Sequence, residues 1–415
     1  MFKVNNYKRT KYACYFAYLS TASIFSLPPL LFMTFHTTYG ISYTLLGTLV
    51  LINFCTQLIV DLIFSFFPKH FNIKATIFTM PILTTLGLSV YALAPHFFPQ
   101  HAYLGLALGT IIFSASSGLG EVFLSPVIAA IPSDNPDRDM SILHSLYGYG
   151  VVSVIIISTL FFNIFGTENW MYLTLFFAFL PIITGFLFAT SPIPDLNLSQ
   201  DKGEKGSSYK RIGVLLCFFC IFLGGAAEIS MTNWVSVFLE TALGIPKTAG
   251  DILGLAAFAV LLALTRTVYA KYGKNISKTL LLSMLGATIC YIVASISTTP
   301  VISMLACIIT GIATSMLWPG TLILLEEKIP SPGVAVYALM AAGGDLGGSI
   351  APQLLGSLVD TVSASDFAQN IGSVLNLVPE QVGLKVGMLV GALFPLMGVI
   401  LLLFMKKYFN KNSQA

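Results

Sequence analysis

Apolar segments of about 20 residues recur along the whole chain and are separated by short polar connections. A helix of this length spans the hydrocarbon core of a bilayer, which is about 30 Å thick. We place these segments at 12–36, 43–67, 75–96, 102–131, 140–165, 170–191, 211–240, 248–272, 276–297, 300–326, 334–360 and 384–405. Only 9% of the residues are charged, compared with about 25% in a soluble domain. The sequence therefore predicts an all-α polytopic membrane protein with twelve transmembrane helices.

The Lys and Arg residues are distributed unevenly about these segments. Of the 21, only Lys247 and Lys385 fall on one side, and the other nineteen mark the opposite side. The positive-inside rule identifies the richer side as cytoplasmic, so both termini are expected in the cytoplasm. We expect a multi-pass protein of the bacterial cytoplasmic (inner) membrane. Because this bias accounts for the net charge of +3, nothing favours a nucleic-acid partner.

A polar connection at 192–210 divides the chain into six segments on either side. It is rich in Ser, Gly, Lys and Asp, as is typical of a flexible linker. We expect an N-terminal six-helix bundle at 1–191 and a C-terminal bundle at 211–415. The two halves look like diverged repeats, because Asp61 in the second segment precedes Lys74 by 13 residues and Arg266 in the eighth precedes Lys278 by 12. Paired repeats of this kind are typical of secondary transporters.

Ionisable residues inside membrane segments are costly and usually functional. Asp61 and Arg266 lie near the cytoplasmic ends of their segments, where they are expected to act in gating or to lock the two bundles together. Glu121 and Glu228 have no neighbouring cation in the sequence and are predicted to carry protons. Asp345 stands between glycine pairs, and it is either a third proton carrier or a packing acid paired across a helix interface.

Polar residues spaced four apart place one polar face on several segments. Asn53, Gln57 and Asp61 form such a stripe, and Gln353 follows Asp345 on another. A sugar site needs acids, amides and hydroxyls together with an aromatic platform. The residues predicted to bind the substrate are Asn53, Gln57, His144, Tyr147, Asn233, Trp234, Trp318 and Gln353. His144 is also consistent with a buried hydrogen-bonding residue, which is the more common role of a buried histidine.

Several segments of the chain resemble a known family. They are Gly118–Pro126 in the fourth membrane segment, His144–Gly150 in the fifth, Asn233-Trp234 in the seventh, Arg266–Gly273 in the eighth, Trp318–Gly320 in the tenth and Gly343–Gly347 in the eleventh. Over essentially its whole length the chain resembles the major facilitator superfamily, and within it the fucose permease-like branch of sugar and proton symporters. This resemblance implies the major facilitator fold of two six-helix bundles, and it implies that Glu121 acts in proton coupling.

One departure from the family pattern concerns the connection after the second membrane segment. The superfamily has a cluster of Gly, Asp and basic residues there, and this chain has only Phe67–Lys74, without the gating carboxylate. The equivalent stretch Tyr269–Lys274 in the second half keeps the basic and glycine character and also lacks the acid. We therefore expect any gate on the cytoplasmic side to be built from other residues.

The main hypothesis is a secondary active transporter that takes up a monosaccharide or similar small polar solute together with a proton, by alternating access. The alternative is a proton-coupled exporter of amphipathic small molecules or drugs, and a nutrient receptor is a third reading. We expect no enzymatic chemistry, no cofactor and no metal. The expected partners are the solute, the coupling proton and the lipid bilayer, and the protein is expected to be a monomer. The sequence leaves the sugar, and sodium as the coupling ion, open.

Overall fold

The computed structural model describes residues 7–66, 71–134, 136–194, 208–329 and 334–412. Within these ranges the chain is helical and contains no strand, which confirms the predicted all-α class. The chain divides into two compact units. Unit 1 comprises Met1–Ile41 and Ile52–Ser199, and unit 2 comprises Ser42–Leu51 and Gln200–Ala415. Most of the expected linker, residues 195–207, lies outside the described residues, as do Phe67 to His70 of the shortened family motif.

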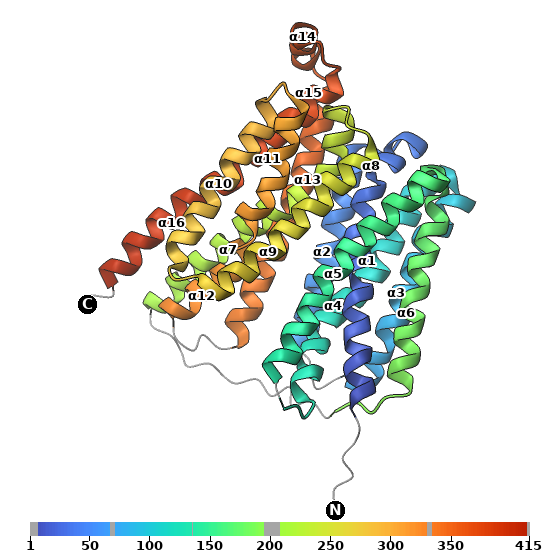
Figure 1. Cartoon of the computed structure of the whole chain (residues 1–415), viewed down its shortest axis with the longest axis vertical. Coiled ribbons are helices and arrows are strands. Elements are labelled where there is room, and N and C mark those ends of the chain that lie inside the picture. The colour runs from blue at the N-terminus through green and yellow to red at the C-terminus, as the bar shows by residue number, and fades with distance from the viewer. Residues whose placement is uncertain (1–6, 67–70, 135, 195–207, 330–333, 413–415) are drawn as a thin grey trace, which may run out of the picture. The chain divides into compact units, whose positions relative to one another are not determined.

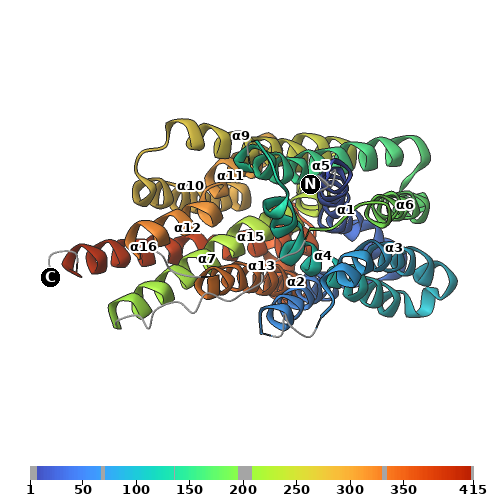
Figure 2. The same ribbon diagram turned by 90° about the horizontal axis from the view of Figure 1, so that it is seen from below.

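Long helices make up unit 1, and two short 3-10 turns connect them (Figure 1). The long helices are α1 (Lys8–Tyr39), α2 (Tyr43–Phe66), α3 (Ile73–Phe97), α4 (Ala102–Ala130), α5 (Pro136–Phe165) and α6 (Trp170–Ala189). The first turns of α2, up to Leu51, belong to unit 2. The turns are η2 (Pro99–His101) and η3 (Thr167–Asn169). Helix α3 packs against both α4 and α6, and α1 packs against α5 (Figure 2). The core of this unit includes Cys14, Phe123, Leu143 and Phe188.

Several helices of unit 2 are interrupted. Its helices are α7 (Ser208–Val237), α8 (Lys247–Ala249), α9 (Ala257–Tyr272), α10 (Ile276–Ile296), α11 (Pro300–Thr314), α12 (Leu317–Lys328), α13 (Val334–Ser363), α14 (Asp366–Leu375), α15 (Pro379–Gly391) and α16 (Leu393–Asn412). Two π-helical segments, η4 (Phe238–Ala242) and η5 (Gly250–Ala256), adjoin α7 and α9. Helix α7 packs against α13, and α10 packs against α11 and α16 (Figure 2). The short helix α14 and the C-terminal end of α16 lie at opposite ends of unit 2 (Figure 1).

Eleven helical stretches in the described residues are long and apolar enough to cross a membrane. Their bounds agree with the predicted segments to within a few residues, as for Tyr43–Phe64 and Ile276–Ile296. The predicted segment 334–360 corresponds to α13, which is not one of the eleven. Helix α13 is nevertheless 30 residues long, which is enough to cross the hydrocarbon core. Because unpaired backbone groups are costly in lipid, continuous helices are the expected solution for such a chain.

Helix ends in the polar connections are capped by side chains. Asn72 and Asn275 accept hydrogen bonds from the backbone N–H of Ala75 and Lys278, at the starts of α3 and α10. The first turn of α2 is capped by α13 instead. The Asp360 carboxylate accepts from the backbone N–H of Tyr43 at 3.1 Å and of Thr44 at 2.6 Å. A carboxylate suits this position because it satisfies unpaired donors and opposes the positive end of the helix dipole.

Candidate functional site in unit 1

The polar face predicted for the second membrane segment is present on α2. Gln57 donates from Nε2 to Asn53 Oδ1 at 3.0 Å, and Ser114 of α4 donates from Oγ to the same oxygen at 2.6 Å. Because Asn53 Oδ1 accepts both bonds, the remaining polar atom of that side chain is its Nδ2 donor. The two amides therefore belong to one hydrogen-bonded cluster that joins α2 to α4.

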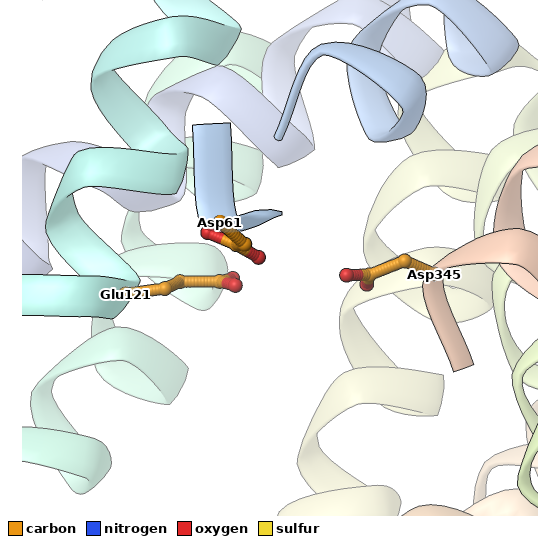
Figure 3. A group of neighbouring side chains, drawn as sticks. All are labelled: Asp61, Glu121 and Asp345. Atoms are coloured by element: carbon orange, nitrogen blue, oxygen red, sulfur yellow. The ribbon is translucent and has the colours of Figure 1, made fainter. Parts of the chain in front are cut away.

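Two carboxylates lie next to this cluster. Helices α2 and α4 approach closely at Gly118, where an added Cβ would lie 3.0 Å from Val60 Cβ and 3.1 Å from the Gln57 carbonyl oxygen. One turn further along α4, Glu121 meets Asp61, and their carboxylate oxygens lie within 4.8 Å of each other. Figure 3 shows the two acids side by side on α2 and α4. Glu121 is exposed and Asp61 is half-buried. We expected Asp61 to act between the bundles, and the structure gives it this partner inside unit 1.

Two carboxylates at this separation have a limited set of chemical states. Coulomb repulsion disfavours the state in which both are ionised, and one bound proton or one bound cation removes that repulsion. Carboxylate oxygens are also ligands for hard cations. The pair can therefore take up and release a single positive charge.

Aromatic side chains extend this polar cluster toward α1 and α5. The Tyr147 ring lies edge-on to Tyr18 and Phe25, with centroids 6.5 and 5.9 Å apart, and Phe25 also contacts Phe54 at 6.0 Å. Tyr147 and Tyr18 are half-buried. Unit 1 thus combines amides, hydroxyls, acids and aromatic edges. His144 lies on α5 one turn before Tyr147, and its side chain is outside the described residues.

Unit 2 contains a further acid, and this one is paired with a cation. Arg266 of α9 donates from Nη2 to both oxygens of Glu228 on α7, at 3.1 and 3.3 Å. Its Nε donates to the backbone carbonyl of Ser315 at 2.8 Å. Glu228 lacks a cation in the local sequence, and the fold supplies one from 38 residues away. All three bonds stay within unit 2, so they differ from the link between bundles that we expected of Arg266.

A proline explains why the Ser315 carbonyl accepts a side-chain donor. In a continuous helix this carbonyl would accept from the N–H of residue 319, but Pro319 has no N–H. The helix is interrupted between α11 and α12, and Gly320 N–H resumes the pattern by bonding to the Met316 carbonyl at 2.8 Å. Trp318 lies beside this break against Gly344, where an added Cβ would collide with its indole ring.

The other residues predicted to bind substrate or carry protons belong to unit 2, and most of them are engaged in helix packing. Trp234 is buried, donates its indole N–H to the Pro352 carbonyl at 3.0 Å, and meets the Tyr43 ring edge-on. Asn233 is also buried and donates to the Ile229 carbonyl one turn earlier. Gln353 donates to Ser357 Oγ at 3.3 Å and to Thr48 Oγ1 at 3.5 Å. Asp345 is buried on α13. The bonds of Trp234 to Pro352 and of Gln353 to Thr48 thus join separate helices of unit 2, whereas the Asn233 bond stays within α7.

Sequence reasoning missed three members of the unit 1 cluster, namely Tyr18, Phe25 and Ser114. Tyr18 and Phe25 are seven residues apart, and Ser114 precedes Glu121 by seven residues, so each pair shares a helix face. Following the helix face of Glu121 back by seven residues would have included Ser114.

Solved structures of similar fold match nearly the whole chain. A bacterial homologue of the human lysosomal transporter Spinster, in an inward-facing and unoccupied conformation, is 13% identical with a TM-score of 0.77, over 97% of this chain and 98% of that one. The inward-open xylose transporter XylE from E. coli is 16% identical with a TM-score of 0.71, over 96% and 95%. A single-residue variant of the E. coli fucose:proton symporter FucP is 12% identical with a TM-score of 0.55, over 95% and 99%.

At these identities the similarity concerns the fold, so the fucose permease-like branch stays a prediction. No curated protein sequence matches the chain. A family model described as Major Facilitator Superfamily matches residues 13–352. That match, the helical fold and the membrane-length helices together identify a transporter rather than an enzyme: the chain belongs to the Major Facilitator Superfamily.

Proposed function

We propose that this protein couples the uptake of a small polar solute, of the monosaccharide class, to the entry of a proton, and that Asp61 and Glu121 hold that proton. The observation that carries the proposal is the approach of the two carboxylate groups to within 4.8 Å of each other. Two acids so close, inside helices that cross a membrane, favour a state with one shared proton.

In the proposed cycle the proton and the solute bind to unit 1 together. Binding of a proton leaves the pair with one negative charge instead of two, which lowers the cost of enclosing it away from water. The half-buried Asn53 amide, held by Gln57 and Ser114, offers its Nδ2 donor to the solute, and the aromatic edges of Tyr147 and Phe25 offer an apolar surface. When the site opens to the cytoplasm, loss of the proton restores repulsion between the carboxylates and favours release.

The monosaccharide class is supported by two observations of different kinds. The cluster in unit 1 offers amides, hydroxyls, acids and aromatic edges, which match the hydroxyls and apolar face of a sugar ring. Solved structures of similar fold also include a D-xylose-proton symporter and the fucose:proton symporter. The first observation concerns the residues of this chain. The second is that other proteins of similar fold are proton symporters.

The test is uptake of radiolabelled monosaccharides into proteoliposomes under an imposed pH gradient. We expect Glu121→Gln and Asp61→Asn each to abolish accumulation driven by the gradient while solute exchange continues. Glu168→Gln is the matched control, because Glu168 is an exposed acid on η3, outside the polar cluster. Accumulation at the wild-type rate in both Glu121→Gln and Asp61→Asn would remove the pair from coupling.

Two arms of the same experiment separate the alternatives. A sodium gradient in place of the pH gradient tests whether the pair binds sodium, and accumulation under that gradient alone would contradict proton coupling. Inside-out vesicles loaded with amphipathic dyes test export. Proton-driven dye extrusion without sugar uptake would favour the exporter alternative.

A further inference from the structure

Unit 2 contains an open pocket that the proposed coupling site does not use. Its volume is about 580 Å³, within the range of small-molecule sites. It is lined by Arg266, Tyr269, Gly273 and Lys274 at and just after the end of α9, by Ile276 at the start of α10, and by Met316, Pro319, Ile323 and Glu327 from the α11–α12 break and α12. The pocket lies at the end of unit 2 that carries the basic connection Lys271 to Lys278.

The polar groups of this pocket are mainly donors. Arg266 uses Nε and Nη2 for Ser315 and Glu228, and Nη1 makes no hydrogen bond within the described part of the chain. Its side chain is 40% exposed. Lys274 is exposed, and among the described residues no carboxylate lies within ion-pair distance of it. The pocket therefore presents a guanidinium edge and an ammonium group together.

The charge balance indicates the kind of ligand. The Arg266 charge is matched by Glu228, and the Glu327 charge is matched by Lys328 at 3.4 Å. Lys274 remains, so the pocket carries one uncompensated positive charge. A singly charged anion would neutralise it. The remaining wall is apolar, because Ile276, Met316, Pro319 and Ile323 line it.

We propose that this pocket binds the singly charged phosphodiester headgroup of an anionic phospholipid. Arg266 Nη1 and Lys274 Nζ donate to the phosphate oxygens, and the apolar wall contacts the glycerol and the first methylenes of the acyl chains. Arginine and lysine near a membrane surface favour anionic headgroups. Inorganic phosphate offers the same oxygens but has no apolar part, so the two sources of phosphate can be distinguished.

The test is native mass spectrometry of the full-length protein titrated with phosphatidylglycerol, with phosphatidylcholine as the zwitterionic comparison. We expect phosphatidylglycerol to bind more tightly than phosphatidylcholine. Lys274→Gln should weaken phosphatidylglycerol binding about fivefold, from about 1 kcal/mol for one lysine near the surface. Lys278→Gln is the matched control, because it removes the same charge from the same connection outside the pocket lining. Lys274→Arg should retain binding.

Three results would overturn the proposal. Equal binding of the two lipids would show that headgroup charge is not recognised. An equal loss in Lys274→Gln and Lys278→Gln would assign the effect to general surface charge. Displacement of phosphatidylglycerol by millimolar inorganic phosphate would assign the pocket to a free anion. Elution of each variant at the wild-type volume in size-exclusion chromatography confirms that a loss of binding reflects the pocket and not unfolding.

Discussion

Arg266 contacts both oxygens of Glu228 through one nitrogen, while its Nε satisfies the Ser315 carbonyl that Pro319 leaves free. One side chain thus stabilises a membrane acid and a break in a membrane helix. Loss of either the Glu228 ion pair or the Ser315 hydrogen bond therefore affects the other, because the same Arg266 side chain makes both.

This arrangement predicts a strong coupling between two substitutions. Glu228→Gln or Arg266→Gln leaves one charge without its partner, and each should lower stability by about 2 kcal/mol. This is less than the 3–5 kcal/mol of a fully buried pair, because the Arg266 side chain is partly exposed. The double variant should lose clearly less than the sum of the two. Thermal unfolding in detergent measures all four proteins, and strictly additive losses would mean that the pair contributes no mutual stabilisation.

The Asp139 carboxylate on α5 predicts a pH dependence of stability. It bonds to Lys11 and Ser133 at the end of α5 that precedes the apolar span. The bonds to Lys11 and Ser133 lower the pKa of Asp139 below its ordinary value of 3.8. A carboxylate whose pKa is lower in the folded state stabilises the fold above the unfolded pKa, and this stabilisation is lost as pH falls through the folded pKa.

Melting temperatures of wild type and Asp139→Asn between pH 3 and pH 7 measure this contribution. We expect the wild type to be more stable by a constant amount above about pH 5, and the difference to shrink below about pH 4. A difference that grows as the pH falls would contradict the predicted sign. Asp134→Asn serves as the control, because Asp134 is an exposed acid in the same connection.

The close approach of α2 and α4 predicts that a larger residue at position 118 is destabilising. In Gly118→Ala the new methyl group presses on Val60 and the Gln57 carbonyl and moves the two helices apart. We expect a loss of about 1–3 kcal/mol and a lower rate of proton-driven uptake, because Asp61 and Glu121 separate. Gly120→Ala is the control, since its nearest contact would be an ordinary 3.4 Å. Equal uptake by the two variants would show that the spacing of the acids does not matter.

Asp360 is predicted to stabilise the start of α2. Asp360→Ala removes the acceptor for Tyr43 N–H and Thr44 N–H and should cost about 1 kcal/mol. Asp360→Asn keeps one oxygen and should cost less. Thermal unfolding compares these two with Asp366→Asn, an acid in the first turn of α14. A larger loss in the control than in Asp360→Ala would argue against the cap.

The sequence predicted the membrane helices well because lipid demands long continuous apolar helices. The predicted segment 276–297 corresponds to α10 (Ile276–Ile296), and the predicted segment 43–67 corresponds to α2 (Tyr43–Phe66). Interruptions inside segments were harder to predict. The break between α11 and α12 follows from Pro319, but the π-helical segments beside α9 have no comparable signal in the sequence.

The sequence predicted which helix faces carry the residues of the candidate site. It did not predict which residues on separate helices contact each other. The spacing of Asn53, Gln57 and Asp61 placed them on one face, and the structure confirms that Asn53 and Gln57 contact each other. That Glu121 would face Asp61, and Arg266 would face Glu228, depends on how separate helices pack. This packing depends on residues such as Gly118, whose effect appears only when both helices are known.

The interruption between α11 and α12 affects how unit 2 can bend. A continuous membrane helix resists bending because backbone hydrogen bonds join each turn to the next. Here one backbone hydrogen bond is absent, and the Arg266 side chain bonds to the Ser315 carbonyl in its place. Without the Arg266 Nε bond the Ser315 carbonyl would have no donor at this turn, and such breaks in the backbone ladder are where helices kink.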